Sequence, residues 1–351
     1  MKNPTLGIGL LAASVTMSPP LVAQQSVAGT QSVIDLARSR AGVVSMPAGA
    51  EQRTIKVGDV ERNYWLLRPS SARSPSPVVF VLHGGAVADG RQTLRYDFQT
   101  LGTRDGVVTV HPSGVGAGWN DGRDTSFLLD RSGAVDDVAF FRSMIDSLIS
   151  EGIADPKQIY VTGGSNGGMM TMRLACDLGE KLAGVAPFVA QLPAKMQDRC
   201  APTRSVPMQI IVGTADRMMP FMGGGVAAMS GDDRGTVLSA AATMDFWRRQ
   251  YRCSETVIRE NLADTDPNDG TRVRVERAQG CAVPLEMVIV EGGGHRLPGE
   301  GPREYNDPRI SALSGVSSRD VSGRDLIWNF FFAAPDVAAA VSAPPADPRR
   351  K

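Results

Sequence analysis

One segment, residues 159–168, constrains the fold of this chain more than any other. It begins with Ile-Tyr-Val-Thr, whose β-branched and aromatic residues favour a strand, and continues with Gly-Gly-Ser-Asn-Gly-Gly into helix-like sequence. A strand that enters a helix through Gly-x-Ser-x-Gly is typical of a nucleophile elbow, in which the glycines allow a sharp turn and the serine Oγ stands above the sheet. We therefore predict that Ser165 is a nucleophile; the alternative is a simple glycine-rich turn.

Strand-like and helix-like segments alternate along the rest of the chain. Continuous apolar runs, typical of strands buried on both faces of a parallel sheet, cover 77–82, 106–110, 159–162, 185–189, 208–212 and 285–290. Helical spacing covers 138–148, 237–251 and 322–331, and a hairpin is predicted where 53–57 and 64–68 flank Gly58-Asp59. This alternation predicts an α/β fold with a mostly parallel central sheet and helices on both faces.

Charge and length restrict the class of protein. The 37 basic and 37 acidic side chains cancel, which argues against a nucleic-acid partner. No linker interrupts the hydrophobic segments, so we predict one large domain. The expected division is a signal peptide at 1–23, an N-terminal extension at 24–50, a catalytic domain at 51–333 and a low-complexity tail at 334–351.

The N-terminus has the order of a secretory signal. Lys2 precedes an apolar run at 6–15, and Ala23 suits the cleavage position. The run has about half of the ~20 residues that a membrane-spanning helix needs, so we predict export to a periplasm or to the outside, without a stable membrane span. An even number of cysteines fits an oxidising compartment. Of three possible pairings we favour the sequential one, in which the pairs are Cys176 with Cys200 and Cys253 with Cys281.

A serine nucleophile needs a base, and the base needs an acid to orient it. Of the three histidines, His83 and His111 end buried strands, whereas His295 follows three glycines after the last predicted strand. We therefore predict His295 as the base. Asp216 follows the predicted strand at 208–212 and lies between serine and histidine in chain order, which favours it as the acid. The competing acids are Asp177, at the end of the helix after the elbow, and Asp233, which is distant from any strand end.

The remaining site residues follow from the chemistry of a tetrahedral intermediate, whose oxyanion needs two amide donors. We predict the backbone N–H groups of Asn166 and of Gly85, with His83 as a structural residue of the loop that carries Gly85. Trp119 and Asn120 are expected to border the substrate pocket. The alternative for Trp119 is that it packs its loop onto the core.

Neither a metal nor a cofactor is expected. The acidic segment 264–269 superficially suggests a calcium loop, but its glycine comes one position late, Pro267 intrudes, and Val275 stands where a glutamate is needed. We predict a solvated hairpin turn there. No cysteine has a partner at Cys-x-x-Cys spacing, which disfavours a zinc or redox site.

Six ordered motifs between about Arg53 and Phe332 resemble the polyhydroxybutyrate depolymerase and feruloyl esterase family of secreted α/β-hydrolases. They are Leu82-His83-Gly84-Gly85, Gly118-Trp119-Asn120-Asp121, Val135-Asp136-Asp137-Val138, Gly164-Ser165-Asn166-Gly167-Gly168-Met169-Met170, Gly213-Thr214-Ala215-Asp216, and Gly293-Gly294-His295 with Pro298-Gly299. The resemblance implies an α/β-hydrolase fold and esterase chemistry. It also implies that Ser165, Asp216 and His295 stand at the triad positions and that the four cysteines pair sequentially.

The chain departs from this family pattern at two positions. Gly85 stands where many relatives have cysteine, and Leu297 stands where an aromatic residue is frequent. The second change is expected to remove an aromatic surface near the base and so to alter substrate contacts.

These observations predict a secreted serine carboxylic ester hydrolase that acts on a small or oligomeric ester. Hydroxyalkanoate esters are the favoured substrate class, and feruloyl or acetyl esters of plant cell-wall polysaccharides are the alternative. A peptidase on the same fold is disfavoured because no gating domain is visible. A non-catalytic binding protein is disfavoured because no triad residue is lost.

Overall fold

The computed structural model describes residues 1, 46–85, 89–116, 118–123, 135–226, 233–300, 312 and 314–332. The predicted signal peptide, the predicted extension up to residue 45 and the predicted tail lie outside these residues, apart from Met1. Within the described part of the chain, the helices are all too short or too polar to cross a bilayer.

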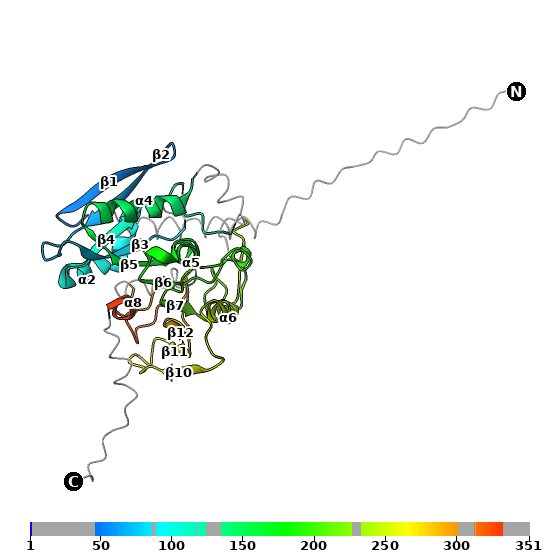
Figure 1. Ribbon diagram of the computed structural model, residues 1–351. Coiled ribbons are helices and arrows are strands. Elements are labelled where there is room, and N and C mark those ends of the chain that lie inside the picture. Colours follow the sequence, from blue (N-terminus) through cyan, green and yellow to red (C-terminus); the bar gives the residue numbers. More distant parts are fainter. Residues whose placement is uncertain are drawn as a thin grey trace, which may run out of the picture. The chain divides into compact units, whose positions relative to one another are not determined.

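A ten-stranded mixed sheet forms the centre of the fold (Figure 1). Its strand order is β1-β2-β4-β3-β5-β6-β7-β12-β11-β10. The strands are β1 (Ala50–Val57), β2 (Val60–Leu67), β3 (Ser76–Leu82), β4 (Val108–Pro112), β5 (Ala154–Gly164), β6 (Gly184–Phe188), β7 (Met208–Gly213), β10 (Val257–Asn261), β11 (Arg272–Ala278) and β12 (Leu285–Glu291). The six strands from β4 to β12 in this order are parallel, and antiparallel strands extend the sheet at both edges. The sheet thus has the mostly parallel centre that the sequence predicts.

Helices cover both faces of the sheet (Figure 1). They are η1 (Gly90–Tyr96), α2 (Phe98–Asp105), α4 (Asp137–Ser150), α5 (Asn166–Asp177), η2 (Gly179–Lys181), η3 (Ala194–Met196), α6 (Ala240–Gln250) and α8 (Gly323–Phe332); β8 (Gly224–Gly225) and β9 (Thr236–Val237) form a small separate ribbon. Helices α4, α5 and α6 contribute to the hydrophobic cluster on one face, and α2 and α8 to the cluster on the other. The predicted α/β-hydrolase architecture is confirmed.

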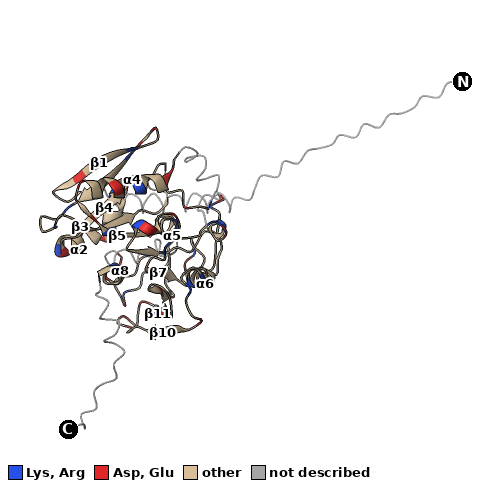
Figure 2. Ribbon diagram, in the orientation of Figure 1, with Lys and Arg blue, Asp and Glu red and all other residues tan. Residues whose placement is uncertain are grey.

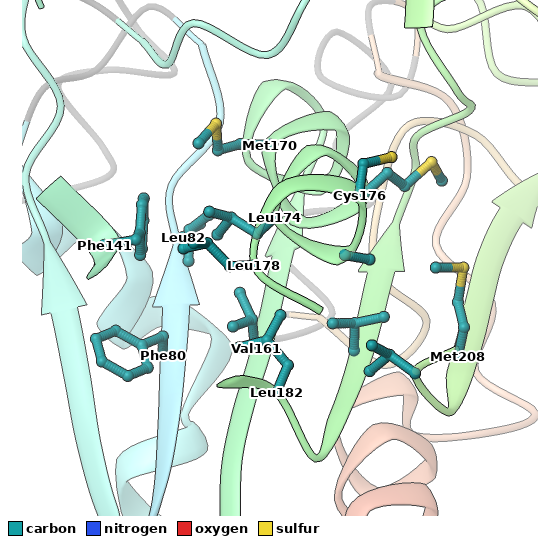
Figure 3. Packing of buried hydrophobic residues seen from close by; sticks show 14 of the residues in the cluster. Phe80, Leu82, Phe141, Val161, Met170, Leu174, Cys176, Leu178, Leu182 and Met208 are labelled. Atoms are coloured by element: carbon teal, nitrogen blue, oxygen red, sulfur yellow. The ribbon is translucent and has the colours of Figure 1, made fainter. Parts of the chain in front are cut away.

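The alternation of side chains along β3 explains how one strand serves both clusters. Phe80 and Leu82 belong to the cluster under α4 and α5, whereas Val79 and Val81 belong to the opposite cluster. Figure 3 shows Leu174 of α5 next to Leu82, and Phe141 of α4 above Phe80. Apolar residues at both faces are what a parallel strand covered by helices on two sides requires.

The structure contains elements that the sequence patterns did not indicate. Helix α2 is short, and the antiparallel strands β10 and β11 carry many charged residues, so neither gave a long apolar run. The predicted hairpin at Gly58-Asp59 is present, with Val57 paired to Val60. Helix α6 begins at Ala240, because Val237 lies in β9 and Ser239 caps the helix by accepting from the N–H of Ala242.

Acidic and basic residues are interspersed along the described ribbon (Figure 2). Near the start of α4, the ion pair between Arg62 and Asp137 is fully buried. Asp136 caps this helix by accepting from the N–H of Ala139, as expected for an acid at a helix start. Asp137 lies 2.8 Å from the guanidinium of Arg62 in β2 and accepts from the N–H of Asn120 at 2.7 Å. This aspartate therefore connects the helix to the loop that follows β4.

Two disulfides belong to or pack against the same hydrophobic cluster. Cys176 at the end of α5 pairs with Cys200, and Cys253 after α6 pairs with Cys281 after β11. This is the sequential pairing that the sequence favours. Loops of this length contribute about 3 kcal/mol each to stability by restricting the unfolded chain.

Two histidines are buried at the ends of strands. His83 follows β3 and has a pKa lowered by burial to about 4, and His111 in β4 has a pKa lowered by burial to about 3. His111 donates through Nδ1 to Thr93 Oγ1 at 2.5 Å, because that hydroxyl donates its own hydrogen to the carbonyl oxygen of Gly90. Both imidazoles are therefore neutral and hydrogen-bonded in the folded protein at neutral pH.

These histidines are expected to make the fold sensitive to acid. Their pKa values are near 6.5 in the unfolded chain, so the unfolded state binds more protons than the folded state below that pH. The contribution of each buried, neutral imidazole to the free energy of unfolding is complete above pH 6.5 and is lost as the pH falls toward 4. We expect each histidine to remove roughly 2–3 kcal/mol from the free energy of unfolding between pH 7 and pH 4.5, as measured by urea titration.

The variant His111→Asn separates this contribution from that of the carboxylates. It is expected to be less stable than the natural chain at pH 7 but to lose less stability on acidification. If the variant lost as much free energy of unfolding between pH 7 and pH 4.5 as the natural chain, the assignment of acid sensitivity to His111 would be contradicted.

Candidate active site

Ser165 lies at the turn between β5 and α5, where the sequence predicts an elbow. Its φ of 58° and ψ of −122° are unusual for a residue other than glycine, and such strain is frequently found at functional positions. The neighbouring glycines are needed because a Cβ at Gly164 would collide with the ring of Phe188, and one at Gly167 would collide with the carbonyl oxygen of His83. The close packing on both sides therefore holds the serine in its strained conformation.

His295 and Asp216 meet at the same edge of the sheet. Nδ1 of His295 lies 2.7 Å from Oδ2 of Asp216, whose side chain is 2% exposed. The other carboxylate oxygen accepts from the backbone N–H groups of Met218 and Met219, at 2.8 Å each. With its carboxylate fixed by three donors, Asp216 can set both the tautomer and the ring orientation of His295, leaving Nε2 available to accept a proton.

The loops that carry this pair are joined by backbone hydrogen bonds. The N–H of Ala215 donates to the carbonyl oxygen of Gly293, and the N–H of Gly292 donates to the hydroxyl of Thr214. On the other side, the N–H of His295 donates to the carbonyl oxygen of Ser314 at 2.5 Å. His295, the predicted base, is thus held between the loop after β7 and the segment that precedes α8.

The loop after β3 lies against the elbow. A Cβ added to Gly84 would lie 3.5 Å from Cβ of Ser165, and one added to Gly85 would lie 3.6 Å from Cβ of Asn166. His83 supports this loop, since its Nδ1 donates to the carbonyl oxygen of Gly84 at 2.8 Å and its Nε2 accepts from the N–H of Gly114 at 3.0 Å. Its lowered pKa keeps it in the neutral form that this arrangement requires.

The side chain of Asn166 connects the elbow to a second loop. Its Oδ1 accepts from the backbone N–H of Trp119 at 2.7 Å, and its Nδ2 donates to the carbonyl oxygen of the same residue at 3.0 Å. Nδ2 also donates to Asp121, which forms a buried ion pair with Arg123 at 2.9 Å. The indole N–H of Trp119 in turn donates to the carbonyl oxygen of His83 at 2.8 Å. The elbow and both neighbouring loops therefore form one hydrogen-bonded unit.

Trp119 does not have the exposure expected of a pocket residue. Its side chain is completely buried, with its ring 4.6 Å from that of His83. The structure thus places it behind the loop that carries Gly85, in agreement with the packing alternative. Asn120 is partly buried, and both of its backbone polar groups are engaged, the N–H by Asp137 and the carbonyl oxygen by Arg173.

Leu297 lies two residues after His295 and belongs to the core. Its side chain is 2% exposed and packs in the cluster that contains Trp328. Leucine at this position therefore packs into the core. The effect of its identity on substrate contacts stays a prediction.

Several residues that hold the site were not identified from the sequence. Asp121 and Arg123 are charged yet buried within a glycine-containing loop, but no sequence pattern shows that their partner is Asn166. The acidic turn between β10 and β11 is likewise more structured than expected. Asp266 and Asp269 accept from the side chain and the backbone N–H of Arg319, respectively, so this turn is anchored to the segment before α8.

Comparison with known proteins identifies relatives that are named as esterases. A family model described as phospholipase/carboxylesterase matches residues 111–230. The chain is 30% identical over 264 residues to NocK of Nocardia uniformis subsp. tsuyamanensis, a protein that carries the name of an esterase, and the match covers 72% of this chain and 73% of that one. It is 24% identical to feruloyl esterase D of Neurospora crassa, with coverage of 73% and 80%.

A solved structure supports the fold. Acetyl xylan esterase from Aspergillus awamori superposes with a TM-score of 0.52 at 17% identity, and the match covers 76% of this chain and all of that one. The match to NocK, the mixed sheet and the elbow at Ser165 all agree with an α/β-hydrolase. The chain belongs to the family of α/β-hydrolase esterases that includes NocK, and it is a carboxylic ester hydrolase.

Proposed function

We propose that the esterase works through an acyl-enzyme formed on Ser165, with His295 as the base and Asp216 as the acid that orients it. The observation that carries this proposal is the 2.7 Å hydrogen bond between His295 and Asp216, on loops that follow β12 and β7. Ser165 follows β5, so all three residues come after parallel strands and lie at the same edge of the sheet. Ligands in open α/β sheets bind at this edge.

In this mechanism Nε2 of His295 takes the hydroxyl proton as Oγ of Ser165 attacks the ester carbonyl. The imidazolium is stabilised by Asp216 and then gives the proton to the leaving alcohol. We assign stabilisation of the oxyanion to the backbone N–H groups of Asn166, at the first position of α5, and of Gly85. Water repeats the same sequence on the acyl-enzyme and releases the acid.

For the substrate we propose an ester carried by a carbohydrate, such as a feruloyl or acetyl ester of a plant cell-wall polysaccharide. This proposal is supported by the names of the relatives, among them feruloyl esterase B of Piromyces equi, which is 28% identical over 54% of this chain and 34% of that protein. The second candidate is a hydroxyalkanoate ester. It is supported by the six sequence motifs described above, which resemble a family that includes polyhydroxybutyrate depolymerases as well as feruloyl esterases.

We further propose that the protein acts after export. The support is the apolar N-terminal run at 6–15 together with two disulfides, a bond type that persists in oxidising compartments.

Replacement of Ser165 by alanine is expected to abolish acyl transfer. The value of kcat on p-nitrophenyl acetate should fall on the order of 10⁴- to 10⁶-fold, because no other group supplies the attacking oxygen. Labelling with a fluorophosphonate should disappear as well. The matched control is Ser150→Ala, at an exposed position at the end of α4, which should keep both properties. Ordinary turnover by the Ser165 variant would exclude the assignment.

The variant Asp216→Asn tests the identity of the acid. An amide favours the wrong tautomer of His295, so kcat should fall by about 10⁴-fold. Asp233→Asn provides the control, because this competing acid is exposed and its carboxylate accepts from the N–H of Gly235. If the Asp233 variant lost activity and the Asp216 variant kept it, the two assignments would have to be exchanged.

Product release distinguishes the two substrate classes. Methyl ferulate and hydroxybutyrate trimer are supplied at equal concentration, and products are measured by mass spectrometry with the Ser165 variant as the blank. We expect faster release of ferulate. Preferential release of hydroxybutyrate would reject the carbohydrate-ester proposal in favour of the second candidate.

A further inference from the structure

A cleft of about 440 Å³ lies beside the loop that carries Gly85, and neither the triad nor the predicted pocket residues use it. We refer to it as the hairpin cleft. Its walls come from the β1–β2 hairpin, from the start of η1 and from the residues after β4, and include Gln52, Asn63, Trp65, Asp89, Arg91 and Gly114. Three separate segments of the chain thus meet around one open space.

The hairpin cleft is connected directly to the loop that carries Gly85, the proposed oxyanion donor. Gly114 in its wall donates its N–H to His83 Nε2, and His83 holds the carbonyl oxygen of Gly84. The cleft is built on β4 and β2, and the elbow follows β5. In the strand order β2-β4-β3-β5, β4 is two strands and β2 is three strands away from β5. Since neighbouring strands are about 4.8 Å apart, the cleft lies roughly 10–15 Å from the elbow along the sheet. That separation exceeds a small acyl group and suits a later unit of an oligomeric substrate.

Trp65 is the tryptophan that lies outside the hydrophobic clusters of the core. The other three, Trp119, Trp247 and Trp328, are buried in the hydrophobic clusters. Trp65 is only partly buried, belongs to none of these clusters, and its indole N–H has no hydrogen-bond partner among the residues that the structure describes. A large aromatic ring that is not required for packing is available to stack on a ligand.

Two amide side chains stand beside this ring without partners of their own. Within the described chain, neither Gln52 nor Asn63 makes a side-chain hydrogen bond, although both line the cleft. Each amide offers two donors and an acceptor. Hydroxyl groups also both donate and accept, so neighbouring hydroxyls on a ring are well matched to this pair.

The charges in the cleft cancel locally. The guanidinium of Arg91 lies 2.5 Å from the carboxylate of Asp89, and its central carbon is 5.9 Å from the centre of the Trp65 ring. The arginine is therefore already neutralised by its neighbour, which disfavours a phosphate or carboxylate ligand. An aromatic plane, two unpaired amides and no net charge are the features that recognise a neutral sugar.

We propose that the hairpin cleft is a subsite for a neutral saccharide unit of the ester substrate, with Trp65 stacking on the apolar face of the sugar ring. Gln52 and Asn63 bind its hydroxyl groups. The subsite increases the specificity of the enzyme for carbohydrate-borne esters over simple ones. This inference rests on the proposed function in so far as the saccharide carries the ester that is cleaved near Ser165.

Binding of sugars without ester groups tests the subsite independently of hydrolysis. The hexaoses of xylose, glucose and mannose are titrated into the protein and the heat is measured. We expect saturable binding of at least one hexaose, weakened at least tenfold in Trp65→Ala and in Asn63→Ala. The matched control is Asn261→Ala on the exposed strand β10, which should bind as the natural chain does.

Kinetics then show whether the subsite serves catalysis. For a feruloylated oligosaccharide of the hexaose that binds, Trp65→Ala should lower kcat/KM at least tenfold, while kcat/KM for methyl ferulate stays within twofold. Trp65→Phe should restore much of the loss, because a smaller ring still stacks. If Trp65→Ala does not fold, Asn63→Ala and Gln52→Ala provide the same comparison.

The outcomes separate this inference from the proposed function. No saturable binding of any hexaose, or binding that is unchanged in the Trp65 and Asn63 variants, would overturn the saccharide subsite while leaving the esterase mechanism intact. Hexaose binding that depends on Trp65, in a protein that cleaves only hydroxyalkanoate esters, would support the cleft as a sugar site and reject the proposed substrate.

Discussion

The pair of hydrogen bonds between the Asn166 side chain and the backbone of Trp119 is the interaction on which the geometry of the site depends. Asn166 follows the strained Ser165 directly, so a single residue links the elbow to the loop behind it. Its third hydrogen bond goes to Asp121, which is already neutralised by Arg123. Removing one partner of such a buried pair typically costs about 3–5 kcal/mol, so this unit has few alternative arrangements.

The rest of the site is positioned by parallel strands and by glycine contacts. Strands β5, β7 and β12 end at a common edge, which brings Ser165, Asp216 and His295 to one side of the sheet. Backbone hydrogen bonds between the loops, such as the one between Ala215 and Gly293, fix the positions of these residues relative to one another. The side chains of the proposed triad are thus few, and most of the surrounding residues keep loops in place.

The sequence was most informative where chemistry and local structure depend on the same residues. The elbow around Ser165, the apolar run of β3 and the hairpin at Gly58-Asp59 could be predicted because glycine positions and apolar periodicity are local properties. The contacts of Trp119 could not, since its burial depends on His83, which is 36 residues away in the chain. Strand β11 was missed because charged residues on its outer face masked the buried valines.

The position of His295 depends on residues that follow it in the chain. Its N–H is held by Ser314 and that of Gly294 by Val316, residues that are synthesised after all three members of the proposed triad. A fragment of the chain that ended at His295 would therefore lack both of these hydrogen bonds. The segment before α8, which contains none of the three proposed triad residues, thus fixes the backbone of the proposed base.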